Sequence, residues 1–305
     1  MFWYIIANPA AANGAVKRIW PRIEQRLQEL GFSYSIQFSQ YPGHASQLAE
    51  NAILKGYRQL IGLGGDGTHH EIINGILSQQ EVSPQMVHYA PFPIGTGNDW
   101  ARQYRIPNNP VTRLNRLLQP TLVLQDVGKV SYLQPDGQPA TRWFINVAGL
   151  AYDGFVAKKL QENGKHSSRL VYLFAVAKYL FEYQLSKAEI HSESFEPIQD
   201  YFYTINVGIC QYSGGGMQLV PHAIPNDGLL ALTLARKMPK WEVLLQTPRF
   251  YNGTLLNHPK VMGIQTTNLT INPINSLLWL EADGEFLGTA PATFQIKPKA
   301  ISIVT

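Results

Sequence analysis

The sequence predicts an α/β domain with a parallel sheet, followed by a mostly antiparallel β domain. Strand-like and helix-like segments alternate over residues 1–124, which is typical of a parallel sheet covered by helices on both faces. Strand-like segments then dominate residues 125–298. The chain length of 305 residues agrees with two domains, because one domain usually takes about 150 residues.

The first domain is expected to begin with a buried strand, Phe2–Ala7, because this segment is aromatic and β-branched. Apolar residues recur at helical spacing from Ala15 to Leu30, and Gly31 occupies a helix C-cap position. The other elements expected in this domain alternate in type: strand Phe32–Phe38, helix Ala45–Leu54, strand Gln59–Leu63, helix His69–Leu77 and strand Val87–Ile94.

The second domain is expected to consist of strands joined by turns. Pro135-Asp136-Gly137 and Ala282–Glu285 have the composition of hairpin turns. The apolar segment Arg169–Tyr183 has helical character and interrupts the series. The expected strands are Thr121–Leu133, Thr141–Val147, Tyr201–Ile209, Leu229–Ala235, Val261–Asn272, Leu277–Glu281, Thr293–Lys297 and Ile301–Val304.

The composition excludes several classes of protein. Apolar residues make up 45% of the chain, which is enough to bury a core and excludes a disordered protein. The net charge is 25 − 21 = +4, and no dense Lys/Arg run indicates nucleic-acid binding. The single cysteine, Cys210, excludes an intrachain disulfide and a Cys-based zinc site. No export signal or membrane-spanning segment is evident, so a cytoplasmic protein is expected.

Two glycine-rich turns, Gly62–Thr68 and Gly95–Asp99, each follow a strand and precede a helix. Glycine tolerates positive φ and lets backbone N–H groups approach a ligand, and the helix N-terminus adds a positive dipole. Because the carboxyl ends of parallel strands meet at one edge of the sheet, the two turns predict a common phosphate cradle. Asn8–Gly14 is a third junction of this kind. An ordinary tight turn is the alternative for each.

Other nucleotide-binding motifs fit less well. Gly62, Gly64 and Gly67 match the dinucleotide pattern G-x-G-x-x-G. That pattern expects an acidic residue about 20 positions further on, and the segment Met86–Tyr89 offers none, which disfavours a hydride-transfer enzyme. The sequence also lacks the G-x-x-x-x-G-K-[ST] motif of P-loop nucleotidases.

Five acidic residues are candidates for chemistry. Asp66, Asp99 and Asp126 could gather near the cradle, where carboxylates usually hold Mg²⁺ or orient a proton acceptor. The alternatives are a plain helix N-cap at Asn98 or Asp99 and a charge on an exposed strand face at Asp126. Asp283 and Glu285 flank the glycine of a hairpin turn, and they matter only if that turn faces the substrate.

Three motifs follow one another in a set order: Gly64-Gly65-Asp66-Gly67-Thr68 with Glu71, then Pro93–Asp99, then Asp283-Gly284-Glu285. This set resembles the diacylglycerol kinase catalytic family. That family includes the bacterial soluble lipid kinases of the YegS type and the sphingosine and ceramide kinases. The first motif alone also occurs in NAD kinases, whereas the combination is far more specific. His69 and His70 depart from the family pattern, which usually has an apolar residue and Asn there.

The resemblance implies an ATP-binding, NAD-kinase-like α/β domain at residues 1–124 and a β-sandwich substrate domain at residues 125–298. It implies that the last strand, 299–305, returns to the first domain, and that ATP and Mg²⁺ are cofactors. The implied ATP-site residues are Asn8, Pro9, Asn13, Gly14, Ser39, Gly64, Gly65, Asp66, Gly67, Thr68, His69, His70, Glu71, Gly95, Thr96 and Asn98. The implied Mg²⁺ ligands are Asp227 and the backbone carbonyls of Ile224 and Leu229.

The implied reaction is transfer of the γ-phosphate of ATP to a lipid hydroxyl, with Asp283 or Glu285 accepting the hydroxyl proton. The alternatives are a kinase of a soluble alcohol such as NAD, and a nucleotide- or lipid-binding protein without catalysis. The expected partners are a nucleotide and a lipid substrate at the inner membrane surface, where the protein would bind peripherally. The Arg169–Tyr183 helix would pack on the β domain or contact the bilayer beside Lys158, Lys159 and Lys165. The oligomeric state stays open, a homodimer included.

Overall fold

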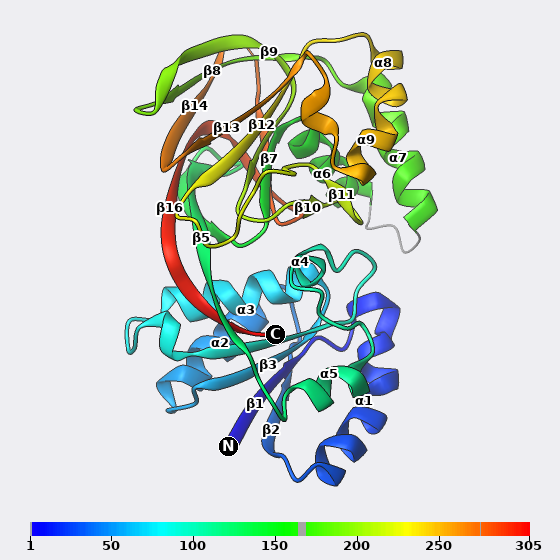
Figure 1. Ribbon diagram of the computed structural model, residues 1–305, viewed down its shortest axis with the longest axis vertical. Helices are drawn as coiled ribbons and strands as arrows, with labels where there is room; N and C mark the ends of the chain where they lie inside the picture. The colour runs from blue at the N-terminus through cyan, green and yellow to red at the C-terminus, as the bar shows by residue number, and fades with distance from the viewer. Residues whose placement is uncertain (1, 164–168, 275) are drawn as a thin grey trace. The chain divides into compact units, whose positions relative to one another are not determined.

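The computed structural model describes residues 2–163, 169–274 and 276–305 (Figure 1). The chain forms two compact units. Unit 1 comprises Met1–Asp126 together with Lys299–Thr305, and unit 2 comprises Val127–Pro298. The long last strand β16, Glu285–Val304, therefore contributes its first part to unit 2 and its end to unit 1.

Unit 1 contains parallel strands in the order β2-β1-β3-β4, and the end of β16 pairs in parallel with β4 through Ser302 and Ile303. The strand bounds are β1 Phe2–Ala7, β2 Ser33–Phe38, β3 Gln59–Gly64 and β4 His88–Pro93. The helices of this unit are α1 Ala11–Glu29, α2 His44–Leu54, α3 Asp66–Ser78, α4 Asp99–Gln103 and α5 Pro110–Arg116, with a 3-10 turn at Pro84–Met86.

The two faces of this sheet are covered by different helices because side chains alternate along a strand. Trp3, Ile5 and Ala7 of β1 form one core with side chains of α1 and α5. On the other face, α3 packs directly on β3 at Gly62: a Cβ built there would lie 2.8 Å from Ile72 Cδ1 and 2.0 Å from the Tyr89 hydroxyl. Glycine is required at this position because no side chain would fit beneath the helix.

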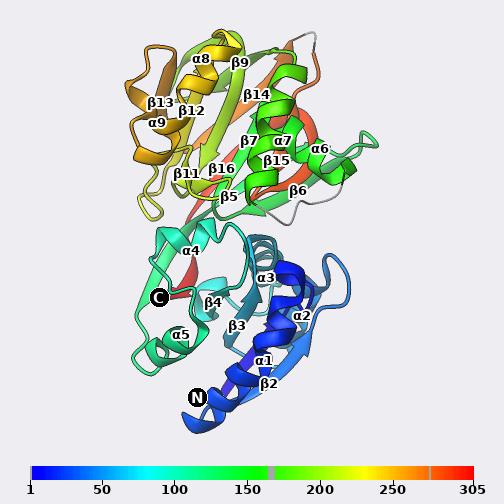
Figure 2. The same ribbon diagram turned by 90° about the vertical axis from the view of Figure 1, so that its right-hand side faces the viewer.

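Unit 2 is built from antiparallel strands (Figure 2). Pairing runs β9-β7-β15-β16 on one path and β9-β8-β14-β16 on the other, so these strands close a ring. The strand bounds are β5 Leu122–Leu133, β6 Pro139–Phe144, β7 Val147–Ala151, β8 Ser186–Ser192, β9 Phe195–Gly208, β10 Tyr212–Ser213, β11 Met217–Gln218, β12 Leu230–Arg236, β13 Val261–Thr266, β14 Asn268–Ile274 and β15 Trp279–Ala282.

Short helices complete unit 2. They are α6 Tyr152–Asn163, α7 Arg169–Glu182, α8 Lys240–Leu245 and α9 Thr247–Asn252, with a 3-10 turn at Leu255–Asn257. Helix α6 packs against β7 and β15 (Figure 2). None of the helices in the described part of the chain is both long and apolar enough to span a bilayer. Lys165, which was expected near a membrane contact, lies outside the described residues, as do the side chains of residues 169–175.

Several elements differ from expectation. Helices α5, α6, α8 and α9 were not predicted: α5, α8 and α9 have only six or seven residues, and α6, with twelve, has weak apolar periodicity. The predicted strand Val261–Asn272 is two strands, β13 and β14, and the two predicted strands Thr293–Lys297 and Ile301–Val304 both belong to β16. The predicted helix starting at His69 begins three residues earlier, at Asp66. The shifted ends of the predicted elements have a common cause, because local patterns specify poorly where an element begins or ends.

Candidate active site

The loops that follow β1, β2 and β3 are joined by hydrogen bonds in unit 1. The Asn8 side chain donates from Nδ2 to Thr68 Oγ1 at 3.0 Å and accepts the Ala10 N–H at Oδ1. The backbone N–H of Ser39 donates to the Ala7 carbonyl at 2.9 Å. Because the strands are parallel, these contacts gather Asn8, Ser39 and Thr68 at one edge of the sheet.

The two glycine turns lie backbone against backbone. A Cβ built on Gly95 would lie 2.7 Å from the Cα of Gly65, and the Ile94 N–H donates to the Gly64 carbonyl at 2.6 Å. Neither Gly65 nor Gly95 has a positive φ. These glycines are therefore needed for close approach, and the expected use of positive φ is wrong at these two positions.

Positive φ occurs instead in the first loop. Ala12, Asn13 and Gly14 have φ values of 48°, 54° and 79°, so α1 is regular only after them. The Arg18 guanidinium donates from Nη1 to the Asn13 carbonyl at 2.7 Å and holds this loop. A run of left-handed residues that includes Ala is strained, and such strain is concentrated at ligand sites. The local geometry supports the interpretation of this loop as part of a binding site.

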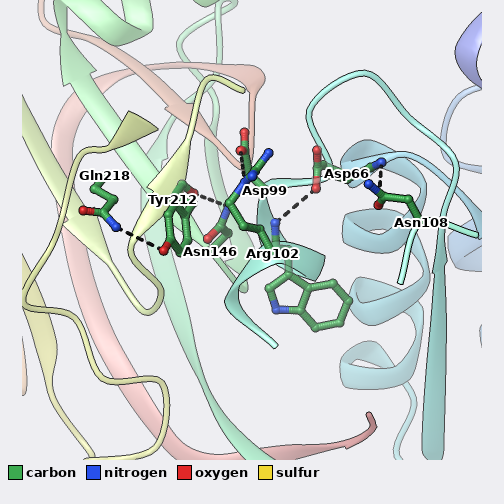
Figure 3. A network of polar contacts seen from close by, with 9 residues as sticks. Asp66, Asp99, Arg102, Asn108, Asn146, Tyr212 and Gln218 are labelled. Carbon is green, nitrogen blue, oxygen red and sulfur yellow. Dashed lines mark hydrogen bonds and ion pairs between the residues drawn. The ribbon is translucent and has the colours of Figure 1, made fainter. Parts of the chain in front are cut away.

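Asp66 and Asp99 border the same glycine. A Cβ built on Gly97 would lie 3.1 Å from Asp66 Oδ2 and 3.2 Å from Asp99 Oδ2. Asp66 Oδ1 accepts the backbone N–H of Trp100 at 3.3 Å, and Arg102 Nε lies 3.9 Å from Asp99 Oδ1 (Figure 3). The structure thus brings the acids of two distant motifs together, each in the first turn of a helix that favours a negative charge there.

Asn98 precedes this acid pair and adopts a left-handed conformation with φ 52°. Its side chain makes no capping bond to α4 within the described part of the chain, so the N-cap alternative is not supported for this residue. Its Nδ2 group donates to Asn108 Oδ1 at 3.4 Å (Figure 3). Thr96, in the same turn, is exposed.

Three implied nucleotide contacts have other roles in the structure. His69 and His70 are each only 1% exposed, so both side chains are packed in the interior, and their place in the ATP site stays a prediction. His69 lies between aromatic rings, with Nδ1 2.6 Å from the Tyr89 hydroxyl, and burial lowers its pKa to about 3. Glu71 accepts the backbone N–H groups of Gly43 and Ala45 at 2.9 and 3.1 Å, which fixes the start of α2.

Asp126 is bonded to the last strand within unit 1. Its side chain is fully buried, and Oδ1 accepts the Lys299 N–H at 2.6 Å. Lys299 has φ 48°, so this bond holds a left-handed residue within β16. The interpretation as a charge on an exposed strand face is therefore wrong, and the role of Asp126 near the cradle stays a prediction. It is a positioning residue for the last strand.

In unit 2, Asp283 forms the turn between β15 and β16, with φ 50° followed by 82° at Gly284. Its carboxylate accepts the N–H groups of Ile145 (3.0 Å), Asn146 (2.9 Å) and Val147 (3.2 Å). Three amide donors stabilise the anion and fix the turn to the start of β7. Glu285, two residues on, is half-buried.

The segment next to this turn is itself anchored within unit 2. Asn146 donates from Nδ2 to the Tyr212 carbonyl at 2.6 Å, and Gln218 donates from Nε2 to the Tyr212 hydroxyl at 3.0 Å (Figure 3). These bonds connect the donors that hold Asp283 to the β10–β11 hairpin. The aspartate is therefore part of a fixed polar framework.

The loop that the family resemblance implies as a Mg²⁺ site is held by hydrogen bonds to Asp227. Asp227 accepts the Leu229 N–H at 3.0 Å through Oδ1 and an N–H of Gln265 at 3.3 Å through Oδ2, and Ile224 is exposed. A carboxylate with neighbouring carbonyl oxygens is the donor set that suits a hard cation. Among the described residues, no three His, Cys, Asp or Glu side chains come together as a metal-binding group.

A buried acidic residue that the sequence did not single out, Glu281, lies next to the turn that holds Asp283. Glu281 is 6% exposed, and burial together with the neighbouring Asp153 raises its pKa well above the usual range. Burial raises the pKa of Asp153 to about 6. The available signal was one acidic residue within the apolar run Leu277–Ala282, two positions before Asp283.

Comparisons with known proteins agree with this geometry. A family model described as "Diacylglycerol kinase catalytic domain" matches residues 3–130, and one described as "YegS C-terminal NAD kinase beta sandwich-like domain" matches residues 146–305. The chain therefore belongs to the diacylglycerol kinase family and is a kinase. This membership also implies that it uses a nucleotide.

Named relatives span nearly the whole chain. The chain is 28% identical to a diacylglycerol kinase of Staphylococcus epidermidis, covering 99% of this chain and 91% of that protein. For a diacylglycerol kinase of Staphylococcus carnosus the values are 26%, 99% and 94%. A crystal structure of a diacylglycerol kinase from Bacillus anthracis has a TM-score of 0.74 at 18% identity, covering 99% of this chain and 96% of that one. Yeast NADH kinase has a TM-score of 0.53 at 12% identity, covering 100% and 83%, which shows a shared fold alone.

Proposed function

We propose that this protein transfers the γ-phosphate of ATP to the hydroxyl of a lipid alcohol. The observation that carries the proposal is the pair of glycine turns in unit 1, which lie backbone to backbone next to the Asp66–Asp99 pair. Family membership and the names of the relatives, which are diacylglycerol kinases, indicate the class of acceptor. Direct phosphoryl transfer depends on positioning of the reactants and neutralisation of the phosphate charge, and it needs no covalent enzyme intermediate.

The nucleotide would bind to unit 1. Thr68, in the first turn of α3, accepts a hydrogen bond from Asn8 in the loop after β1, so the positive end of α3 lies beside that loop, where backbone amides can donate to phosphate oxygens. Ser39, at the end of β2, supplies a hydroxyl at the same edge of the sheet. The phosphates fit here only if the side chains of the loop after β1 are short, as they are at Ala11 and Ala12.

A divalent cation fits the acid pair of unit 1. Asp66 and Asp99 present carboxylate oxygens to one small space beside Gly97, which is the donor chemistry that Mg²⁺ prefers. When bound, Mg²⁺ would neutralise charge on the ATP phosphates. We propose a second, structural role for Mg²⁺ at Asp227 and the carbonyls of Ile224 and Leu229, which would close the loop before β12.

We propose Glu285 as the residue that accepts the proton of the lipid hydroxyl. Asp283 is held by three amide donors that favour its anion, so protonating it would weaken the bonds that fix the turn. Asp283 would therefore position Glu285. This assignment decides between the two carboxylates that the sequence left open.

Peripheral contact with an anionic bilayer would bring the enzyme to its substrate. Trp241 and Leu245 of α8 and Phe181 of α7 are more than 60% exposed, and Lys240 joins the two helices by donating to the Phe181 carbonyl at 2.7 Å. Exposed Trp and Leu beside lysines suit the headgroup region of a membrane. Vesicle sedimentation tests this: Trp241→Ser with Leu245→Ser should release the protein from phosphatidylglycerol vesicles, and unchanged binding would contradict it.

The activity itself is tested with purified protein, ATP and Mg²⁺. Diacylglycerol, ceramide and NAD are offered separately, and the phosphorylated product is identified by mass spectrometry. We expect product from a lipid and none from NAD, and we expect Asp66→Asn to remove it. Product from NAD alone would establish the soluble-alcohol kinase instead. ATP binding without any product from this panel would favour a binding protein.

A further inference from the structure

A polar cluster in unit 2 is built around a glycine in the middle of the sheet. Gly149 of β7 pairs with Glu281 of β15 on one side and with Asn206 of β9 on the other. A Cβ built on Gly149 would lie 2.6 Å from Glu281 Oε1 and 3.2 Å from Asn206 Oδ1. Asp153 of α6 approaches the same point, with its Cβ at 2.7 Å. The missing side chain therefore lets three polar groups meet.

Hydrogen bonds orient this cluster. The Thr204 hydroxyl donates to Asp153 Oδ2, and Asn206 donates from Nδ2 to Thr204 Oγ1 at 3.1 Å. The amide nitrogen of Asn206 is thus turned toward Thr204, which leaves its oxygen facing the space above Gly149. Asn206 is fully buried, and Oδ1 has no hydrogen-bond partner among the described residues. A buried acceptor of this kind needs a donor.

Glu281 is the group that can supply the donor. Its Oε2 accepts the N–H of Gly284, the centre of the turn that carries Asp283 and Glu285, at 2.8 Å. Its Oε1 borders the same space as Asn206 Oδ1. A protonated carboxyl can accept at one oxygen and donate from the other, whereas a carboxylate can only accept.

We propose that Glu281 is a positioning residue that stays protonated, donates its O–H to Asn206 Oδ1, and holds the Asp283–Glu285 turn through the Gly284 N–H. This inference rests on the proposed function, because the turn is the one assigned to proton acceptance. It adds a residue and a protonation state that the reaction depends on. In this arrangement Asn206 accepts the Glu281 O–H, and the missing side chain of Gly149 leaves room for both groups.

The surroundings favour the neutral form. Burial is the largest cause, and the charged groups that face Glu281, Asp153 from α6 and Asp283 from the turn, both oppose a second negative charge. The backbone N–H groups of Gly284 and Gly149 act in the opposite direction, but the pKa of Glu281 is still raised well above its usual range. The pairing residues on β7 and β16, Gly149 and Phe286, are not titratable. Tyr183 interacts with Asp153, and burial raises the pKa of Tyr183 to about 12, so it stays neutral as well. Lys158 of α6 lies 3.8 Å from the Trp279 ring centroid.

The activity test compares two substitutions of the same residue. Glu281→Gln keeps a neutral group with one acceptor and one donor, so kcat at neutral pH should stay within about threefold of the wild type. Glu281→Ala removes both bonds, and kcat should fall at least about tenfold with little change in the KM for ATP. An alkaline loss of kcat in the wild type should be absent from Glu281→Gln. Equal losses in Gln and Ala would overturn the proposal, because they would mean that the ionised form is required.

A second readout does not depend on any kinase activity. Because the folded state holds the Glu281 proton to higher pH than the unfolded state, this group makes stability fall as pH rises above its unfolded pKa. Glu281→Gln should therefore have a higher Tm than the wild type at pH 8, and the difference should shrink toward pH 4. Glu196→Gln, at an exposed position of β9, should show no such trend. A Tm difference that does not vary with pH would overturn the proposal even if the protein phosphorylated no lipid.

Discussion

Two glycines in this molecule create similar spaces with different electrostatics. Gly97 in unit 1 leaves room for Asp66 and Asp99, and Gly149 in unit 2 leaves room for Glu281 and Asp153. Arg102 lies 3.9 Å from the first pair, and both acids begin helices. The charged groups facing Glu281 are other acids, and it is buried. Two acids beside a glycine can therefore present an ion site, or one of them can be held protonated by burial and by the other acid, according to their neighbours.

The largest effect is expected where a negative charge is removed from the acid pair of unit 1, Asp66 and Asp99. Asp66→Asn keeps an acceptor for the Trp100 N–H but removes the negative charge, so kcat should fall about 10²–10³-fold while the Tm stays close to that of the wild type. Steady-state phosphorylation of the lipid substrate measures the loss. Glu281→Gln, the same kind of exchange in unit 2, is the control that should retain activity. Full activity of Asp66→Asn would show that the acid pair of unit 1 is not catalytic.

The two glycines should also differ in how much stability is lost when a methyl group is added. Gly149→Ala would place a Cβ 2.6 Å from Glu281 Oε1 and 2.7 Å from a side-chain carbon, so unfolding free energy should fall by about 1–3 kcal/mol. Gly97→Ala meets its nearest atom at 3.1 Å and should cost less than about 0.5 kcal/mol. Urea unfolding measures both. Equal losses would show that the space above Gly149 is not more tightly filled.

A third prediction concerns the turn that Glu281 supports. Asp283→Asn replaces one acceptor oxygen by an N–H₂ group that faces backbone donors, so unfolding free energy should fall by about 1–3 kcal/mol. ATP binding, which is assigned to unit 1, should stay near normal in a calorimetric titration. A stable Asp283→Asn protein without activity would instead return the proton-accepting role to Asp283.

The smallest effect is a pH dependence of opposite sign in unit 1. The pKa of His69 is lowered to about 3, so the unfolded state binds this proton first as pH falls, and stability is lost from about pH 6.5 downward. Between pH 6 and pH 5 the loss should be about 1 kcal/mol. His69→Phe should flatten that slope, although losing the Tyr89 hydrogen bond lowers its overall stability. Parallel slopes in both proteins would mean that His69 does not titrate differently on folding.

Much of the fold follows from local sequence patterns. The strand Phe2–Ala7 is confirmed with both ends as predicted, and α2 and α7 differ from the expected helices by one residue at an end. Alternating apolar residues and glycine stops encode such elements directly. The short helices α8 and α9 escaped notice because six residues hold too little periodicity, and the break at Thr267 between β13 and β14 has no turn composition.

The sequence by itself determined the family motifs, the glycine turns and the acids that follow them, because these need only neighbours along the chain. Tertiary structure decided which of those residues are buried and which are accessible. It buried His69 and His70 beneath the sheet edge and turned Asp126 toward β16. It also brought Glu281, Asp153 and Asn206 together across three elements. Burial and charge depend on segments far apart in sequence, so protonation states were fixed only when the chain had folded.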